Sequence, residues 1–173
     1  MNSNLVLKNI GRFLLLALLQ VLVFNNVYLG GYITPCLYLL FLAMLPTNTG
    51  KIATLLIAFF TGLTIDVSTG MLGLHTAACT LVGFLRPIWL DKIIMRDNEE
   101  AIEQPSLFSC PYQQFALYLL FLLLIFYFIY YLLLVFDLHA LPTILISTIL
   151  STLITWLLAV LYQTLFTRKH PKP

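Results

Sequence analysis

The residues best suited to chemistry are an acid and a histidine within a largely apolar stretch of the chain. Asp66 is followed closely by Ser68 and Thr69. His75 lies nine positions after Asp66, beyond Gly70. A carboxylate near the centre of a membrane costs about 2.5 to 3.5 kcal/mol, so it is retained only with partners, access to water or a function.

Three roles for Asp66 follow from this setting. It is expected to cap the turn after it, with Ser68, Thr69 and the backbone N–H groups near Gly70 as donors. Alternatively, it contacts a partner at the outer face of a membrane, or it shares a polar site inside the protein with His75.

Catalytic and metal-binding patterns are weak in this sequence. No Ser or Cys stands in a nucleophile elbow with His75, no HExxH motif occurs, and Asp66 and Asp137 are too far apart in the sequence to indicate a dyad. An intramembrane hydrolase is therefore a minor alternative, and we do not expect an enzyme. Neither a metal nor another cofactor is expected, because a zinc site would need a cluster of Cys and His residues at ligand spacing and the sequence has none. The three cysteines are Cys36, Cys79 and Cys110.

The composition indicates that these residues lie in a membrane protein. Hydrophobic residues make up 61% of the 173 residues and charged residues 9%, which leaves too little polar surface for a water-soluble globule. The length predicts a single membrane domain over residues 1–173, without an added soluble domain of ordinary size. The net charge of +2 gives no indication of nucleic-acid binding.

The positive charges predict how the chain crosses the membrane. All nine Lys and Arg residues lie at the two ends or in two interior gaps between apolar runs, and the gaps around 25–31, 66–70 and 137–140 contain none. By the positive-inside rule, this distribution predicts an all-α polytopic protein with six transmembrane helices and cytoplasmic N- and C-termini. The nine residues are Lys8, Arg12, Lys51, Arg86, Lys92, Arg96, Arg168, Lys169 and Lys172.

The six apolar runs differ in length. Runs 32–45, 52–65 and 71–85 are short for a hydrocarbon core of about 30 Å. They are expected either to borrow flanking residues, or to pack inside the bundle with broken, partly re-entrant ends. The other runs are 13–24, 115–136 and 141–166. Four or five spans are the alternatives.

The main hydrophilic stretch is a cytoplasmic loop at about 88–114, which holds five of the seven acids. It is either a docking site for partners or a solvated connector. Its first part, residues 88–94, has the spacing of a short amphipathic helix at the lipid headgroups, with Trp89 at the interface. Pro105 and Pro111 predict a loop over residues 103–111.

Small and aromatic residues predict which helix faces pack together. Gly73 and Ala77, four positions apart, predict a packing seam on run 71–85. Run 141–166 has a longer stripe, which is expected to form a tight helix contact within the chain or with a second copy. Its members are Ser147, Ser151, Thr155 and Ala159. The many Phe and Tyr residues of run 115–136 predict a surface for lipid or for a partner helix.

The segment around Asp66 resembles a known family. The string Gly62-Leu63-Thr64-Ile65-Asp66, with Ser68, Gly70, Gly73-Leu74-His75, Gly83-Phe84 and Arg86, is similar to the signature of MreD, the small rod-shape-determining membrane protein of bacteria. The resemblance marks Gly62, Asp66, Gly70, Gly73 and His75 as motif positions. It implies the fold of the S components of energy-coupling-factor transporters, and a scaffold rather than a catalyst.

The resemblance also implies location and partners. The chain is expected in the bacterial inner membrane, where it acts in lateral peptidoglycan synthesis and cell shape. MreC is the expected direct partner, with MreB, RodA and the elongation transpeptidase as indirect ones. The alternative is a substrate-binding S component of a vitamin importer, which would need an outward-facing pocket with several convergent polar groups.

Overall fold

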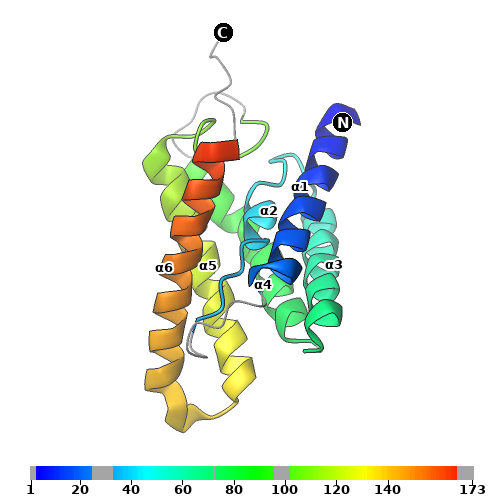
Figure 1. The fold of residues 1–173 in the computed structure, drawn as a ribbon. Coiled ribbons are helices and arrows are strands. Elements are labelled where there is room, and N and C mark those ends of the chain that lie inside the picture. The colour runs from blue at the N-terminus through cyan, green and yellow to red at the C-terminus, as the bar shows by residue number, and fades with distance from the viewer. Residues whose placement is uncertain (1–2, 25–32, 72, 96–101, 167–173) are drawn as a thin grey trace.

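The computed structural model describes residues 3–24, 33–71, 73–95 and 102–166, and within these ranges the chain is helical without any β-strand. Five helices of 16 to 26 residues form the bundle (Figure 1). They are α1 (Ser3–Leu22), α3 (Lys51–Thr69), α4 (Leu74–Trp89), α5 (Tyr112–Val135) and α6 (Leu141–Phe166). Three short elements join them, namely α2 (Leu39–Ala43), the π-helix η2 (Leu90–Met95) and the 3₁₀ turn η3 (Leu138–Ala140).

Successive elements run in opposite directions through the bundle. In Figure 1, α1, α3 and α5 run away from the end where the chain begins, and segment 33–45, α4 and α6 run back toward it. The first residues of α1 and the last residues of α6 therefore lie at the same end.

Three of the helices are long and apolar enough to cross a membrane, namely α3, α5 and α6. The described residues therefore contain three such helices, fewer than the six that the positive charges predict. Run 32–45 contains only the five-residue α2, because Pro35 disfavours helix at Thr34 before it and Pro46 ends any helix after it. Helix α4 has 16 residues, and α1 carries Lys8 and Arg12 in its first half.

The two expectations for the short runs apply to different runs. Helix α3 extends run 52–65 at both ends, to Lys51 and Thr69. Run 32–45 instead packs inside the bundle, where Cys36 and all the residues to Leu45 are buried. Non-helical backbone at membrane depth requires neighbouring protein to satisfy its polar groups. The partners of segment 33–45 are therefore central to this structure.

Helix α5 presents its aromatic residues to the interior of the bundle. This contradicts the expectation that they form a surface for lipid or a partner helix. Their hydroxyl groups explain the difference, because a buried Tyr O–H needs a polar partner and segment 33–45 supplies several. The buried aromatic residues of α5 are Phe115, Tyr118, Phe126, Tyr127, Tyr130 and Tyr131.

The loop between α4 and α5 packs onto the bundle where the structure describes it. The backbone N–H of Thr47 donates to the Glu103 carbonyl at 3.1 Å, and the N–H of Leu107 donates to Gln163 Oε1 on α6 at 2.9 Å. Glu103 itself is exposed. Asp91, in η2, is exposed as well, and the remaining acids, Asp97, Glu99 and Glu100, lie outside the described residues, so the docking hypothesis stays a prediction.

The predicted amphipathic helix at 88–94 is a continuation of α4. Trp89 ends α4 and stacks on Phe121 of α5, with ring centroids 4.8 Å apart. The π-helix η2 follows without a break, and its Leu90 and Ile94 are buried. This stretch therefore lies against α5 rather than as a separate helix at the headgroups.

Candidate functional site

Asp66 lies in the last turns of α3, with its side chain fully buried. Its Oδ2 accepts the backbone N–H groups of Gly73 at 3.0 Å and Thr76 at 2.8 Å, together with the Thr76 hydroxyl. Its Oδ1 accepts the N–H of His75 at 3.0 Å. The first N–H groups of a helix have no partner within that helix, and its N-terminus favours negative charge. Asp66 therefore caps α4 from the neighbouring helix.

The donors to Asp66 differ from those expected. Ser68 and Thr69 belong to the last turn of α3, where their hydroxyls donate to the carbonyls of Thr64 at 2.8 Å and Ile65 at 3.0 Å. These bonds to the preceding turn are the usual ones for Ser and Thr within a helix. The expectation that Ser68 and Thr69 bind the carboxylate is therefore wrong.

Two glycines shape the turn between α3 and α4. Gly70 ends α3 with a φ of 70°, and Gly73 precedes α4 with a φ of 97°. Other L-residues pay roughly 1 to 2 kcal/mol in this left-handed region, whereas glycine enters it freely. Both motif positions are thus explained by backbone conformation.

Gly62 lets α3 and α4 approach closely. A Cβ atom at this position would lie 2.6 Å from the carbonyl oxygen of His75 and 2.6 Å from Thr76 Cα. Further along the same contact, a Cβ at Gly83 would lie 2.5 Å from the Cβ of Ala58. The two backbones therefore nearly touch at two places, and the contact at Gly62 places Asp66 over the start of α4.

The His75 side chain points away from Asp66. Its Nδ1 is hydrogen-bonded to the Tyr38 hydroxyl at 2.9 Å, and the Cys79 thiol donates to the same hydroxyl at 3.7 Å. The imidazole packs against Tyr130, with ring centroids 4.9 Å apart. The structure thus joins His75 to Asp66 through the backbone N–H only, and the expected polar site shared by both side chains is not formed.

Ala77 does not take part in a seam within the chain. It is exposed, as is Gly73, so the predicted seam through these two residues faces outward. The face of α4 that packs inside the bundle carries Ala78, Cys79 and Gly83 instead.

The stripe on α6 is an internal contact. Ser147, Ser151, Thr155 and Ala159 are all buried. Ser151 Oγ lies 2.7 Å from the Tyr131 hydroxyl and accepts the backbone N–H of Thr34 at 3.2 Å. One turn further, Thr155 Oγ1 lies 2.5 Å from the Tyr127 hydroxyl. The stripe therefore packs against α5 and segment 33–45, which leaves it covered rather than open to a second copy.

Segment 33–38 is held by side chains from three helices. Gln20 of α1 binds it twice, donating Nε2–H to the Pro35 carbonyl at 2.9 Å and accepting the Leu37 N–H at 3.0 Å. The Tyr127 hydroxyl donates to the Thr34 carbonyl at 2.8 Å. Sequence reasoning missed these residues, although a glutamine inside an apolar run is a signal that nearby backbone needs a partner.

Arg86 is a second buried charge at a helix end. Its side chain is 1% exposed, and its guanidinium donates to the carbonyl of Leu45, just after α2. The Tyr118 hydroxyl donates to the Ala43 carbonyl at 3.1 Å, two residues earlier. A cation is favourable at a helix C-terminus, as an anion is at an N-terminus. Arg86 therefore lies at the C-terminal end of α2, and Asp66 lies at the N-terminal end of α4.

The site as a whole is built from groups that are already bonded within the fold. Both oxygens of Asp66 accept hydrogen bonds, and His75 Nδ1 is engaged by Tyr38. Among the residues that the structure describes, no three His, Cys, Asp or Glu side chains lie close enough to hold a metal ion. This arrangement can fix the α3–α4 pair and segment 33–45 in place.

Comparison with protein-family models, curated proteins and solved structures finds no match to this chain. The resemblance to MreD therefore rests on the residues quoted above.

Proposed function

We propose that the chain is a non-catalytic inner-membrane scaffold of the MreD type, which takes part in lateral peptidoglycan synthesis and rod shape by binding MreC through helix contacts. MreB, RodA and the elongation transpeptidase would be reached through this complex. The observation that carries the proposal is that the motif residues make their contacts within the chain. Asp66, His75 and Gly62 bind or contact other parts of the same chain, so the surfaces open to partners are the apolar helix flanks.

Two such flanks are prominent. Helix α6 exposes a row of large apolar side chains that includes Ile149, Leu153 and Leu157. Helix α3 exposes Leu63 and Val67 on its far side. In a membrane, such surfaces meet either lipid or the helices of other proteins, which associate by packing rather than by the hydrophobic effect. Lateral contact with a single-span partner fits this distribution of polar and apolar groups.

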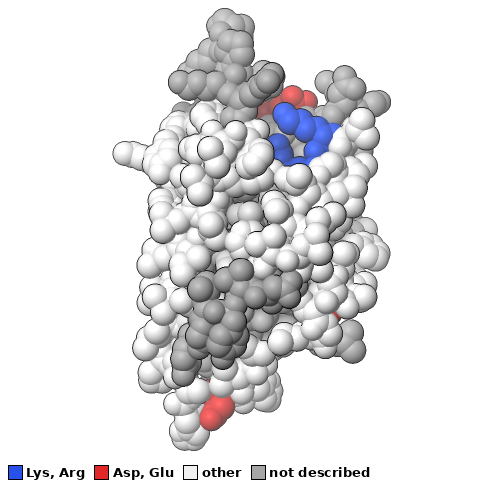
Figure 2. All heavy atoms as spheres, viewed as in Figure 1, with Lys and Arg blue, Asp and Glu red and all other residues white. Residues whose placement is uncertain are grey.

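We further propose that the chain passes through the membrane six times, with segment 33–45 as one broken passage. Support comes from the charges of the described residues. The visible Lys and Arg side chains gather at the end where α1 begins (Figure 2). Asp137 lies in the turn between α5 and α6 at the opposite end. The positive-inside rule then makes the end with the termini cytoplasmic.

A vitamin-importer S component is less well supported. Of the polar residues expected at its outer end, Asp66 is buried as a cap, and Asp137 Oδ1 accepts the N–H of His139 at 2.9 Å. Asn25 and Asn26 lie outside the described residues. The remaining groups are too few to fix a polar ligand, because such pockets require several convergent polar groups.

The topology is checked by reporter fusions at the ends of each passage. Fusions after residues 50, 105 and 173 should report the cytoplasm, and fusions after 30, 69 and 138 should report the opposite side. The fusions after 30 and 50 matter most, because they bracket the broken segment. If both lie on the same side, segment 33–45 is not a passage and the six-pass proposal is wrong.

The scaffold function is checked by purifying the intact protein from native membranes and measuring recovered MreC. Wild-type protein should bring MreC with it. Introducing Trp at one of the two flanks, by Leu153→Trp on α6 or Val67→Trp on α3, should lower recovery about fivefold, the effect of losing about 1 kcal/mol at an interface. The other Trp variant is the matched control. Absence of MreC from the wild-type preparation would contradict the proposal.

A further inference from the structure

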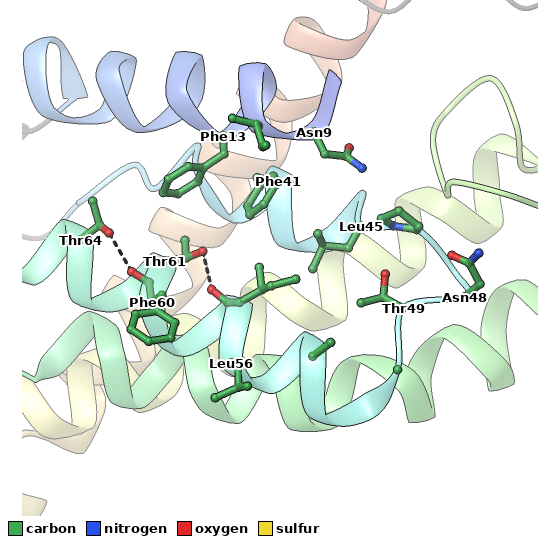
Figure 3. A pocket seen from close by; sticks show the side chains of 15 residues that line it. Asn9, Phe13, Phe41, Leu45, Asn48, Thr49, Leu56, Phe60, Thr61 and Thr64 are labelled. Atoms are coloured by element: carbon green, nitrogen blue, oxygen red, sulfur yellow. Dashed lines mark hydrogen bonds between the residues drawn. The ribbon is translucent and has the colours of Figure 1, made fainter. Parts of the chain in front are cut away.

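An apolar groove lies between α1, α2 and α3 (Figure 3). It has a volume of about 510 Å³, within the range of about 300 to 1,000 Å³ typical of ligand sites. Phe13, Phe41 and Leu56 contribute to its walls. Its lining extends along α3 from Gly50 to Thr64. This stretch is about 21 Å long at 1.5 Å per residue.

The groove is polar at one end only. Asn9, Asn48 and Thr49 lie together at this polar end, as Figure 3 shows. At the other end the lining includes Thr61 and Thr64, but their hydroxyls donate to the carbonyls of the preceding turn of α3, at 2.7 and 2.8 Å. The hydroxyls of these two threonines are therefore already bonded to the backbone, and the body of the groove is effectively apolar.

Positive charge flanks the polar end. Lys51 follows Gly50 at the first position of α3, and Lys8 precedes Asn9 on α1; both are exposed. Gly50 gives α3 no side-chain cap, so the first N–H groups of the helix also face this end. In Figure 2 the visible Lys and Arg side chains gather over the beginning of α1. The neighbouring acid is Glu103, whose backbone carbonyl accepts the Thr47 N–H, so the two lysines leave this end with a net positive charge, which is complementary to a phosphate group.

We propose that the groove binds one anionic phospholipid, with an acyl chain along the apolar body and the phosphate at Asn9, Asn48 and Thr49. The size of the groove favours a lipid chain over a helix. A helix is about 10 Å across with its side chains, so 21 Å of it occupies roughly 1,600 Å³, more than the groove holds. This inference requires a membrane around the chain but not the scaffold function.

The test is native mass spectrometry of the full chain, purified in mild detergent, stripped of lipid and titrated with phosphatidylglycerol or phosphatidylcholine. One phosphatidylglycerol should bind at least about fivefold more tightly than phosphatidylcholine, because each Lys near an anionic headgroup contributes about 1 kcal/mol, whereas the choline group of phosphatidylcholine offsets the charge of its phosphate. Equal affinity for the two lipids would overturn the proposal. This measurement involves no MreC, so its failure is distinct from failure of the scaffold.

Variants locate the bound lipid. Ala53 lines the groove and is exposed, so Ala53→Phe should block it and lower phosphatidylglycerol affinity about tenfold, a loss of about 1.4 kcal/mol. Ala77→Phe is the matched control at an exposed alanine of α4 and should bind normally. Thermal unfolding midpoints equal to wild type show that both variants fold. If Ala53→Phe binds lipid as well as Ala77→Phe does, the groove is not the site.

A second pair tests the charge. Lys51→Gln should lower phosphatidylglycerol affinity about fivefold and leave phosphatidylcholine unchanged. Lys92→Gln, which removes an exposed charge from η2, should change neither. An unchanged phosphatidylglycerol affinity in Lys51→Gln would overturn the placement of the phosphate. Release of a co-purifying single-span protein by Ala53→Phe, with lipid binding intact, would make a helix the occupant and overturn the proposal.

Discussion

Replacing Asp66 with alanine is expected to lower the free energy of unfolding by about 3 kcal/mol, because a buried donor left without a partner costs about 1 to 3 kcal/mol and two part-buried donors lose their acceptor as well. The substitution would strand three backbone N–H groups, those of Gly73, His75 and Thr76. The His75 N–H is buried, so water cannot readily replace the carboxylate there, whereas the N–H groups of Gly73 and Thr76 are part-buried. The measurement is thermal or chemical unfolding in detergent, with immunoblots of membrane abundance.

Replacing Asp66 with asparagine tests whether this cap needs both oxygens of the carboxylate. In a simple cap, Asn is about as good as Asp. Here both oxygens of Asp66 accept, Oδ1 from His75 and Oδ2 from Gly73 and Thr76. Whichever way an Asn amide is turned, its NH₂ group faces an N–H donor. Asp66→Asn should therefore lose about 1 to 3 kcal/mol, less than Asp66→Ala but more than a cap exchange.

The matched control is Asp137→Asn. Asp137 is exposed and accepts a single N–H, from His139, so its exchange should change stability by less than about 1 kcal/mol. Stability of Asp66→Asn equal to wild type, together with rounded cells, would contradict the double-acceptor account. It would assign the charge of Asp66 to a contact outside the cap.

How far the sequence predicts this site depends on how local each contact is. The cap by Asp66 is predictable, since an acid before a second apolar run suits the N-terminus of the helix that follows. Its donors are not, because they depend on how far α3 continues. Once α3 reaches Thr69, Ser68 and Thr69 bond within their own helix, and the N–H groups of the next helix are left for Asp66.

For the fold, the sequence predicts the lengths of the long helices but not how they are oriented. Runs 115–136 and 141–166 are predicted closely as α5 and α6, because long apolar stretches specify helix length. The face that α5 turns inward is not predicted, since nearly every side chain on it is apolar or aromatic. Its orientation is set by segment 33–45, where Tyr127 binds the backbone of Thr34 and Cys36 and Tyr131 binds the Thr34 hydroxyl. Pro35 and Pro46 were the available signal.

Gly62→Ala and Gly83→Ala are both expected to destabilise the α3–α4 contact, but a second substitution should rescue only Gly83→Ala. Overpacking a tight contact costs about 1 to 3 kcal/mol, and more where nothing can move. At Gly62 the obstacles are backbone atoms of His75 and Thr76, so the added methyl group must push the helices apart. At Gly83 the nearest obstacle is the Cβ of Ala58, a side-chain atom.

Removing that Cβ should therefore rescue one variant only. The double variant Gly83→Ala with Ala58→Gly should recover most of the lost stability, since it moves the methyl group from one helix to the other. Ala58→Gly should give Gly62→Ala no such recovery, because its obstacles remain in place.

Gly11→Ala is the control on α1, where a Cβ meets nothing within 4 Å. It should be neutral or stabilise the helix by up to about 1 kcal/mol. Unfolding midpoints of these five variants measure the coupling. Equal losses in Gly83→Ala with and without Ala58→Gly would show that the remaining neighbours, the Thr54 carbonyl above all, set the spacing of α3 and α4.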